Sequence, residues 1–287
     1  MGFLFRWIAQ DSPPHSPEYK STTMEALSLL RKVAIVTGSS SGIGAAAAKL
    51  MARRGAQITL HGRNQDRLEA VKADIINSGI ASNNVISVTG DVTDAKVREQ
   101  IVSETLGAFG QIDILINNAG AGAPATPLVE LTKEGLNSSL DVLLHSVIQL
   151  SQLCHPHLAK TKGNIVNISS ILGTVAIPGM YGYSCAKAGL DMFTVYAATE
   201  FGKDKIRVNS VSPGPINTPL HRRARPENPE SADEFLAAAA AAAPLGSVGI
   251  SEDVAEIIAF YASDAAKHIT GDNNIIDGGL SLPIVFR

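Results

Sequence analysis

Cysteine is nearly absent from the chain of 287 residues, which contains only Cys154 and Cys185. Two cysteines cannot form a disulfide framework, and a chain of this length needs none, so we expect a reducing compartment, namely the cytoplasm. Cys154 begins the stretch CHPH, but the sequence offers no second pair of ligands at zinc spacing. We therefore expect no metal site, and we interpret both cysteines as buried apolar thiols.

The sequence also lacks a strong excess of charge and a long hydrophobic run. Its 24 basic and 27 acidic residues give a net charge of -3, and without a basic block we expect no nucleic-acid partner and no binding to an anionic membrane. The apolar start of the chain is interrupted by Arg6 and is too short to span a bilayer. We expect no membrane span, and we interpret residues 1–30 as an N-terminal extension, in part disordered.

From Lys32 onward the sequence alternates between two hydrophobic patterns. Short runs rich in β-branched residues end in Gly, Asn, Asp or Ser, as strands do, and longer stretches with a period of about 3.6 residues end in glycine, as helices do. The alternation predicts a single-domain α/β fold over residues 31–287, namely a doubly wound, Rossmann-type parallel sheet with helices on both faces. The expected strands are 33–38, 57–62, 84–92, 112–120, 163–170, 206–214 and 273–279, and the expected helices include 42–55 and 64–79.

A glycine-rich turn, TGSSSGIG, follows the first expected strand and opens the first expected helix. Gly38 permits a tight turn, Gly42 lets the backbone approach a phosphate, and Gly44 permits close packing of the helix on the strand. The N–H groups at the helix N-terminus suit a pyrophosphate. The turn therefore predicts a dinucleotide site, and the alternative is a flexible surface loop.

The end of the second expected strand reads LHGRN. A site for NAD places a carboxylate there to bind the ribose hydroxyls, whereas a site for NADP replaces it and supplies a cation for the 2′-phosphate. Gly62 stands at the place of the acid, Arg63 follows it, and the next acid is Asp66. This pattern favours NADP(H) with Arg63 as a phosphate ligand; alternatively, Arg63 is an ordinary surface residue.

The stretch YGYSCAK contains two tyrosines ahead of a lysine. In a helix, Tyr183 and Lys187 are i and i+4 neighbours on one face. We therefore expect the ammonium to lower the phenol pKa from its ordinary value of about 10 and to make Tyr183 a general acid. Tyr181 points elsewhere, and we expect it to line the site. The alternative is an amphipathic helix with one tyrosine packed inward.

Five motifs occur in one order along the chain: TGSSSGIG, NNAG at 117–120, Ser170, YSCAK and SPGPINT. In this order they resemble the classical short-chain dehydrogenase/reductase family over residues 32 to about 281. The resemblance implies a nicotinamide cofactor held by the phosphate turn, an Asp-Val pair at the adenine, NNAG and the PGPINT segment. The implied cofactor-binding residues, beside Arg63, Tyr183 and Lys187, are Gly38, Ser40, Gly42, Ile43, Gly44, Asp91, Val92, Asn118, Ala119, Gly120, Pro213, Gly214, Ile216 and Thr218.

The resemblance also implies a catalytic arrangement. The family's serine lies 13 residues before its tyrosine, which is Ser170 in this chain. Tyr183 would exchange a proton with the substrate oxygen, Ser170 would hydrogen-bond that oxygen, and Lys187 would bind the nicotinamide ribose and stabilise the tyrosinate. The cofactor carries the hydride. The implied reaction interconverts a carbonyl compound and an alcohol, and the implied assembly is a homodimer or homotetramer.

One position departs from the pattern of the family. The family carries a fourth catalytic residue, an asparagine, in the helix after NNAG; here Asp141 and Val142 match its surroundings, and Leu143 occupies its place. A leucine side chain neither donates nor accepts a hydrogen bond, so the water chain behind the lysine would lack its anchor. Asn137 lies six residues away, on a different helical face, and is a poor substitute.

The substrate end of the site is the part that the sequence defines least. Residues 219–246 fall where the family has its substrate lid and combine a basic, proline-rich start with seven consecutive alanines. Apolar residues between 171 and 180 suggest a pocket for a hydrophobic substrate or, alternatively, ordinary core packing. We expect an NADP(H)-dependent oxidoreductase acting on a small or hydrophobic ketone, aldehyde or alcohol. The alternative is an NADP(H)-binding protein with weak or no turnover and a regulatory or scaffolding role.

Overall fold

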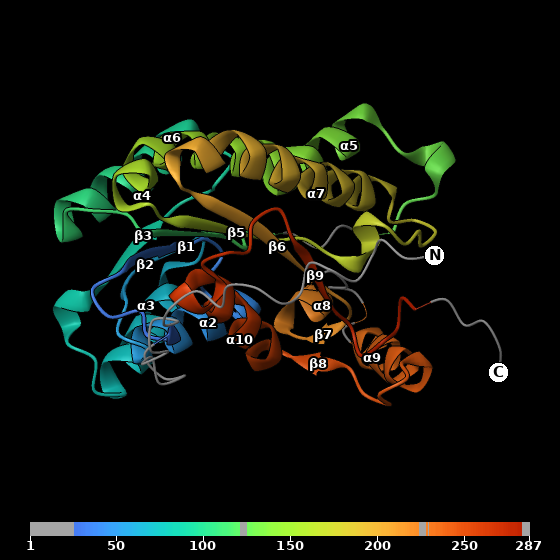
Figure 1. The fold of residues 1–287 in the computed structure, drawn as a ribbon. Helices are drawn as coiled ribbons and strands as arrows, with labels where there is room; N and C mark the ends of the chain where they lie inside the picture. The colour runs from blue at the N-terminus through green and yellow to red at the C-terminus, as the bar shows by residue number, and fades with distance from the viewer. Residues whose placement is uncertain (1–25, 121–124, 224–227, 229, 283–287) are drawn as a thin grey trace, which may run out of the picture.

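Seven parallel strands form the central sheet of the computed structural model, which describes residues 26–120, 125–223, 228 and 230–282. The strand order is β3-β2-β1-β4-β5-β6-β9, so the chain crosses from one side of β1 to the other after β3 (Figure 1). This order confirms the predicted doubly wound, Rossmann-type sheet. The strands are β1 (Val33–Val36), β2 (Gln57–Gly62), β3 (Val85–Thr89), β4 (Ile114–Asn117), β5 (Asn164–Ile168), β6 (Arg207–Pro213) and β9 (Asn273–Ile276).

Each of the seven predicted strands is present, although most of them end earlier than predicted. The predicted strand 112–120 ends at Asn117, and the predicted strand 163–170 ends at Ile168. The polar and glycine residues that follow leave the sheet and form turns at its carboxyl edge. A separate parallel pair consists of β7 (Ile216–Asn217) and β8 (Gly249–Ile250).

Helices cover both faces of the sheet, as predicted. Successive strand residues point to opposite faces, so Ala34 and Val36 pack with one helical layer and Ile35 packs with the other. One sheet between two layers makes the described chain a single domain. The layer below the sheet in Figure 1 contains α2 (Gly42–Arg53), α3 (Gln65–Asn77) and α10 (Ser251–Ala262), and the layer above it contains α4 (Ala95–Phe109), α6 (Ser146–Thr161) and α7 (Tyr181–Phe201).

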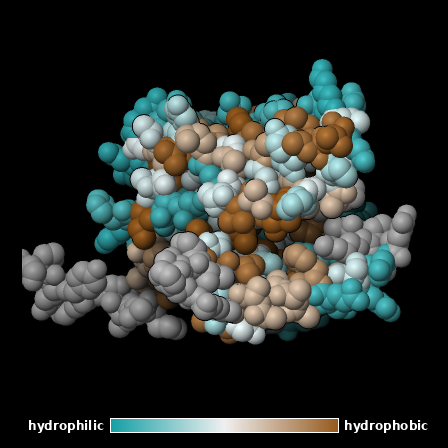
Figure 2. Space-filling model, turned by 90° about the vertical axis from the view of Figure 1, so that its right-hand side faces the viewer, coloured by the Kyte–Doolittle hydropathy of each residue, from teal (hydrophilic) through white to brown (hydrophobic). Residues whose placement is uncertain are grey.

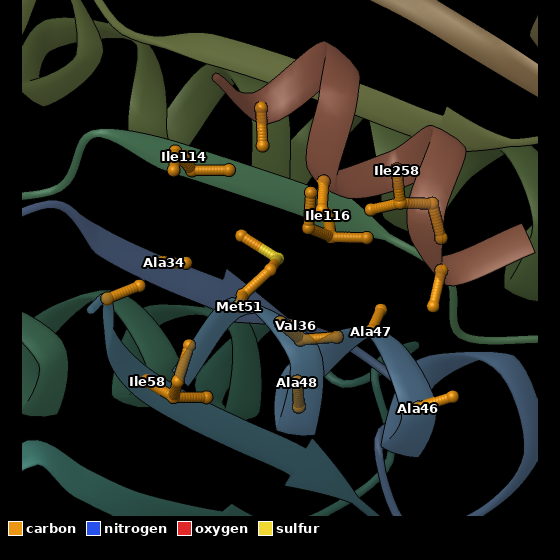
Figure 3. Close-up of a cluster of buried hydrophobic side chains, with 14 of the residues drawn as sticks. Ala34, Val36, Ala46, Ala47, Ala48, Met51, Ile58, Ile114, Ile116 and Ile258 are labelled. Atoms are coloured by element: carbon orange, nitrogen blue, oxygen red, sulfur yellow. The ribbon is translucent and has the colours of Figure 1, made fainter. Parts of the chain in front are cut away.

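Small side chains on α2 let this helix approach the sheet closely. Ala47 and Ala48 are fully buried, and Met51 reaches from the same helix toward Ala34 and Ile116 of two neighbouring strands (Figure 3). The flexible thioether of methionine fills the irregular space that the alanines leave. This packing fixes α2, and with it the glycine-rich turn at its N-terminus, against the carboxyl edge of β1.

A wide turn interrupts the long helix that runs beside α7. α5 (Lys133–Leu140) continues through a π-helical turn (Asp141–His145) into α6, and such turns are frequent at functional sites. The remaining helical segments are short. They are α8 (Pro219–Arg223), α9 (Ser231–Ala242) and the 3-10 turns Ser82–Asn84, Leu128–Glu130, Ile171–Gly173, Gly202–Asp204 and Asp264–Ala266.

The folded domain begins before residue 31, where the sequence predicted its start. Leu29 is buried in the core, and its N–H donates a hydrogen bond of 2.8 Å to the carbonyl oxygen of Arg54. Residues 1–25 of the predicted extension lie outside the described residues. Across the described ranges, no helix combines the length and the apolar character that crossing a bilayer requires.

Candidate functional site

The carboxyl edge of the sheet contains a cavity of about 260 Å³, next to the point where the strand order reverses. Doubly wound sheets bind their ligands at this place. The predicted cofactor-binding residues that line the cavity are Gly38, Ser40, Gly42, Ile43, Arg63, Asp91, Val92, Asn118, Ala119, Gly120 and Thr218. The other described lining residues are Ser41, His61, Gly62, Asn64, Arg67, Val142, Leu220 and Arg223.

The glycine-rich turn uses its glycines for two different physical reasons. Gly38 and Gly42 have φ angles of +66° and +59°, in the left-handed region that L side chains rarely adopt. At Gly44 the restriction is steric, because a Cβ atom there would lie 2.3 Å from Asn118 Nδ2. At Gly38 and Gly42 the backbone of the turn therefore forms the wall of the cavity without an intervening side chain.

Asn118 holds the turn in place from the end of β4. Its Nδ2 donates to the carbonyl oxygens of Thr37 at 2.9 Å and Gly38 at 3.2 Å, and its N–H donates to Thr37 Oγ1 at 3.0 Å. Ser41, the N-cap residue of α2, makes no side-chain capping hydrogen bond, so it leaves the first N–H groups of the helix to other partners. The braced turn and the helix N-terminus fit the pyrophosphate of a dinucleotide.

The end of β2 carries a glycine, followed by an arginine, where an NAD site has a carboxylate. A Cβ atom at Gly62 would lie 3.2 Å from Ser40 Oγ. The side chain of Arg63 is 71% exposed, and its Nη1 lies 3.8 Å from Asp91 Oδ2. Partial burial acts to raise the pKa of Asp91, but hydrogen bonds from Thr93 and the charge of Arg63 outweigh it, so the net shift is downward. The adenine end of the cavity therefore pairs an ionised carboxylate with a solvated guanidinium.

The sequence analysis assigned no role to three polar residues of the cavity wall, His61, Arg67 and Arg223. His61 is 1% exposed, and among the described residues its ring nitrogens have no hydrogen bond of good geometry, only a weak contact with the backbone of Gly90. Burial lowers the pKa of His61 to about 4, against smaller opposing effects of Gly90 and Asp91, so the ring is neutral. A buried polar group costs free energy unless a ligand or water supplies its partner. The sequence signal that could have identified His61 was a polar ring at the end of an apolar strand.

Ser170, Tyr183 and Lys187 lie together beyond the carboxyl end of β5. Ser170 is the N-cap residue of the 3-10 turn after this strand, and its Oγ accepts a hydrogen bond of 3.2 Å from the N–H of Leu172. Tyr183 and Lys187 lie one turn apart in α7. Lys187 is buried, and its Nζ faces the Tyr183 ring and donates to the carbonyl oxygen of Ile168 at 2.6 Å. The fold thus brings the three predicted residues to one point.

The pKa of Tyr183 shifts in the direction opposite to the one that the sequence predicted. Burial raises this pKa above its ordinary value, and the hydrogen bond with Ser170 only partly opposes the rise. Burial also lowers the pKa of Lys187 to about 8, opposed by the carboxylate of Asp191. The prediction was wrong because it counted the charge of Lys187 but not the loss of solvent around the phenol. Tyr183 is therefore protonated at neutral pH.

Asp191 is a further residue of this site that the sequence analysis missed. It lies one helical turn beyond Lys187 in α7, and burial raises its pKa, whereas Ser169, Lys187 and Asn273 oppose the rise. The available signal was the i, i+4 spacing from Lys187. The buried ammonium therefore has an acidic residue within electrostatic range on the same helix.

The PGPINT segment reaches the cavity at one of its predicted positions. Thr218 lines the cavity, whereas the side chain of Ile216 is buried in the core. Pro213 pairs with Ile276 of β9, and the N–H of Gly214 donates to the carbonyl oxygen of Ile276 at 2.9 Å. Pro213, Gly214 and Ile216 therefore anchor the segment to the fold, and their contact with a cofactor stays a prediction.

Known proteins share both the sequence and the fold of this chain. Residues 38–281 match the family model described as Enoyl-(Acyl carrier protein) reductase. The chain is 35% identical over 250 residues to the 3-oxoacyl-[acyl-carrier-protein] reductase of Thermotoga maritima, a match that covers 87% of this chain and 97% of that protein. The chain belongs to the classical short-chain dehydrogenase/reductase family.

Two further members of the short-chain dehydrogenase/reductase family illustrate the match. A 7alpha-hydroxysteroid dehydrogenase from Bacteroides fragilis is 34% identical over 254 residues, which covers 88% of this chain and 95% of that protein. The crystal structure of a family member of unknown function from Caenorhabditis elegans, solved with cofactor, has a TM-score of 0.84 at 38% identity and covers 88% of this chain and 96% of that one. Membership makes the chain an oxidoreductase of a family that binds nicotinamide cofactors.

Leu143 remains the departure from the short-chain dehydrogenase/reductase pattern. It is 2% exposed and lies in the π-helical turn between α5 and α6. Its Cδ2 lies 3.7 Å from the position that a Cβ atom on Gly120 would occupy. The side chain therefore faces the NNAG motif, and it places an apolar group where the family's pattern has an amide.

Proposed function

We propose that this chain is an NADP(H)-dependent oxidoreductase that interconverts a ketone or aldehyde and an alcohol by hydride transfer. The observation that carries this proposal is the meeting of Ser170, Tyr183 and Lys187 at the carboxyl edge of the sheet. The Tyr183 phenol shares a hydrogen bond with Ser170 and has the Lys187 ammonium beside its ring. A hydrogen-bond donor, a protonated phenol and a cation at one place suit proton transfer to an oxygen that is gaining negative charge.

Each of these residues has a defined role in the proposed reaction, and Lys187 also binds the nicotinamide ribose. Tyr183 delivers its proton to the carbonyl oxygen of the substrate, and Ser170 donates a hydrogen bond to the same oxygen. The positive charge of Lys187 stabilises the tyrosinate that remains. When bound, the nicotinamide supplies the hydride for reduction or accepts it in the reverse direction. The protein contributes position and charge, which lower the barrier without a covalent intermediate.

Several features of the cavity support NADP(H) as the cofactor. Gly62 carries no side chain and lies against Ser40, which leaves the 2′ position without an acidic partner. Arg63 follows it with a solvated guanidinium, a group that binds phosphate through paired hydrogen bonds. The proposed contacts of the remaining cofactor-binding residues follow from the cavity lining and from the family pattern.

The substrate is proposed to be small or hydrophobic. Figure 2 shows hydrophobic residues gathered across the middle of the face between the layer of α5 and α7 and the layer of α8 and α9. Ile177 and Tyr181, which precede or begin α7, are exposed. The names of two relatives describe an oxoacyl reductase and a hydroxysteroid dehydrogenase, and each name is consistent with carbonyl and hydroxyl interconversion. We propose the segment 219–246 as the substrate lid.

A homodimer or homotetramer is proposed as the assembly. Met192, Val195 and Tyr196 are exposed on α7, and their i, i+3 and i+4 spacing places them on one face of the helix. Exposed apolar side chains on one face favour contact with another chain.

The cytoplasm remains the proposed compartment, supported by the two free cysteines Cys154 and Cys185.

The test of this function is NADPH oxidation, followed by absorbance, with a panel of aldehydes, ketones and diketones. Turnover with members of the panel, together with its loss in Tyr183→Phe, is the expected result. NADPH binding without turnover on any member would instead support the alternative, an NADP(H)-binding protein with a regulatory or scaffolding role. The buried Leu143 is the observation that favours this alternative, because it removes one polar group from the site.

A further inference from the structure

Three arginines converge on the cavity from separate elements of the fold. Arg63 follows β2, Arg67 lies in α3, and Arg223 lies in α8. Burial is the largest cause that lowers the pKa of Arg223, and the charges of Arg67 and Arg63 lower it further. The three guanidinium groups are therefore close enough to act on one another electrostatically. Among the described lining residues, Asp91 is the one acid. The excess of positive charge at this place favours an anionic ligand.

The contacts of Arg223 leave its charge available. Its Nη2 donates to Ser41 Oγ of the glycine-rich turn at 2.8 Å, and its Nε donates to the carbonyl oxygen of Pro219 at 3.2 Å. Neither acceptor carries a negative charge, so neither neutralises the guanidinium. The contact with Ser41 joins two segments that are 182 residues apart in the sequence. It already places the Arg223 side chain over the turn that is proposed to hold the cofactor phosphates.

The acid of the cavity neutralises little of this charge. Asp91 lies 3.8 Å from Arg63, and both side chains are largely solvated, so this ion pair is weak. A phosphate dianion, by contrast, offers several acceptor oxygens and can bind two guanidinium groups at once. The 2′-phosphate of NADP(H) is the group that the proposed function would bring to the end of β2.

We propose that Arg223 binds the 2′-phosphate of NADP(H) together with Arg63, and that this contact ties α8 to the cofactor. The inference rests on the proposed NADP(H) dependence. α8 begins the segment 219–246, the proposed substrate lid, so the phosphate contact would attach the first helix of the lid to the cofactor. NAD(H) lacks the phosphate and would leave Arg223 with its contacts to Ser41 and Pro219.

Arg222 provides a matched control one residue away. Its Nη2 donates to Asp233 of α9 at 2.5 Å, and it does not line the cavity among the described residues. NADPH and NADH are titrated by fluorescence against the wild type, Arg223→Ala, Arg223→Lys and Arg222→Ala. We expect Arg223→Ala to weaken NADPH binding about tenfold, the scale of one charge-assisted hydrogen bond, and to leave NADH binding unchanged. The NADPH affinity of Arg223→Lys should fall between that of the wild type and that of Arg223→Ala. Arg222→Ala should bind both cofactors as tightly as the wild type does.

Hydrogen exchange of the segment 219–246 gives a second readout that does not depend on turnover. In the wild type saturated with cofactor, NADPH should slow exchange in this segment more than NADH does, and Arg223→Ala should abolish the difference. If the wild type prefers NADPH but Arg223→Ala keeps wild-type affinity and exchange, this inference is overturned and the proposed cofactor stands. If the wild type shows no preference for NADPH, both this inference and the proposed NADP(H) dependence are overturned.

Discussion

The ammonium of Lys187 lies 5.5 Å from the centre of the Tyr183 ring, one turn further along α7. Burial acts on the two groups in opposite senses, since it raises the pKa of the phenol and lowers the pKa of the ammonium to about 8. The phenol therefore keeps its proton at neutral pH, while the lysine titrates not far above it. The environment, more than the attraction between the two groups, sets the protonation state of the pair.

Replacement of the Tyr183 phenol should separate catalysis from cofactor binding. We expect Tyr183→Phe to abolish turnover and to leave NADPH affinity nearly unchanged, because the hydroxyl is lost while the cavity around the phosphates is untouched. The matched control is Tyr181→Phe, which alters a side chain that is 46% exposed and should be mild. Steady-state rates and fluorescence titration measure the two effects. A more damaging effect of Tyr181→Phe would show that the acid has been assigned to the wrong tyrosine.

The rate of carbonyl reduction should depend on pH through Lys187. Its pKa of about 8 means that the ammonium is present at lower pH and is lost as the pH rises through that value, so kcat/KM should be level at neutral pH and fall above about pH 8. The Asp191 carboxylate opposes the lowering of this pKa. Asp191→Asn should therefore move the fall to lower pH.

The control for Asp191→Asn is Glu200→Gln, which neutralises an exposed acid near the end of the same helix. Its pH profile should match that of the wild type. If the profile of Asp191→Asn also matches the wild type, the carboxylate does not act on the group that controls reduction.

Loss of the Arg63 guanidinium should reduce the preference for NADPH. We expect Arg63→Ala to weaken NADPH binding by about tenfold and to change NADH binding little. Tenfold is at the lower end of the effects of charge-assisted contacts, because the Arg63 side chain is solvated. Arg53→Ala, at the far end of α2, provides a control with the same change in net charge. Titration of both cofactors against both variants measures the effect. An unchanged ratio of the two affinities in Arg63→Ala would remove this residue from the 2′-phosphate site.

Restoring an amide at position 143 should increase turnover. Leu143→Asn places a hydrogen-bonding group beside the NNAG motif, where the family's pattern has one. We expect kcat to rise several-fold and KM for NADPH to stay almost unchanged. This rise is a fraction of the roughly 10²- to 10⁴-fold that acid–base groups contribute to the rate. A buried amide without partners costs about 1–3 kcal/mol, so Tm should be measured with the rate.

The control is Leu143→Ala, which removes the leucine side chain without adding a polar group and should not raise kcat. A folded Leu143→Asn protein with unchanged or lower kcat would show that this chain does not use the four-residue arrangement of its family.

The fold and the centre of the site could be predicted because their signals are local. The β-branched runs marked seven strands, and the spacing of Tyr183 and Lys187 placed both on one helical face. The glycine-rich turn was recognisable because Gly38 and Gly42 need left-handed backbone angles, which few other residues tolerate.

The parts that could not be predicted depend on contacts between distant segments. Arg223 reaches the cavity only because α8 folds back over Ser41, and no local pattern in the sequence reports this approach. The direction of the Tyr183 pKa shift depends on burial, which is a property of the whole fold. The same holds for Leu29, which looked like part of an extension but packs in the core.

The hydrogen bonds from Asn118 to Thr37 and Gly38 join two halves of the chain that are made at different times. The first half, through β3, carries the glycine-rich turn and Arg63, and the second half, from β4 onward, carries Asn118 and Thr218. Neither half encloses the cavity, so a nascent chain gains its dinucleotide site only when the halves dock. A cofactor that binds only the docked form shifts the folding equilibrium toward that form by mass action, so bound cofactor would hold the two halves together.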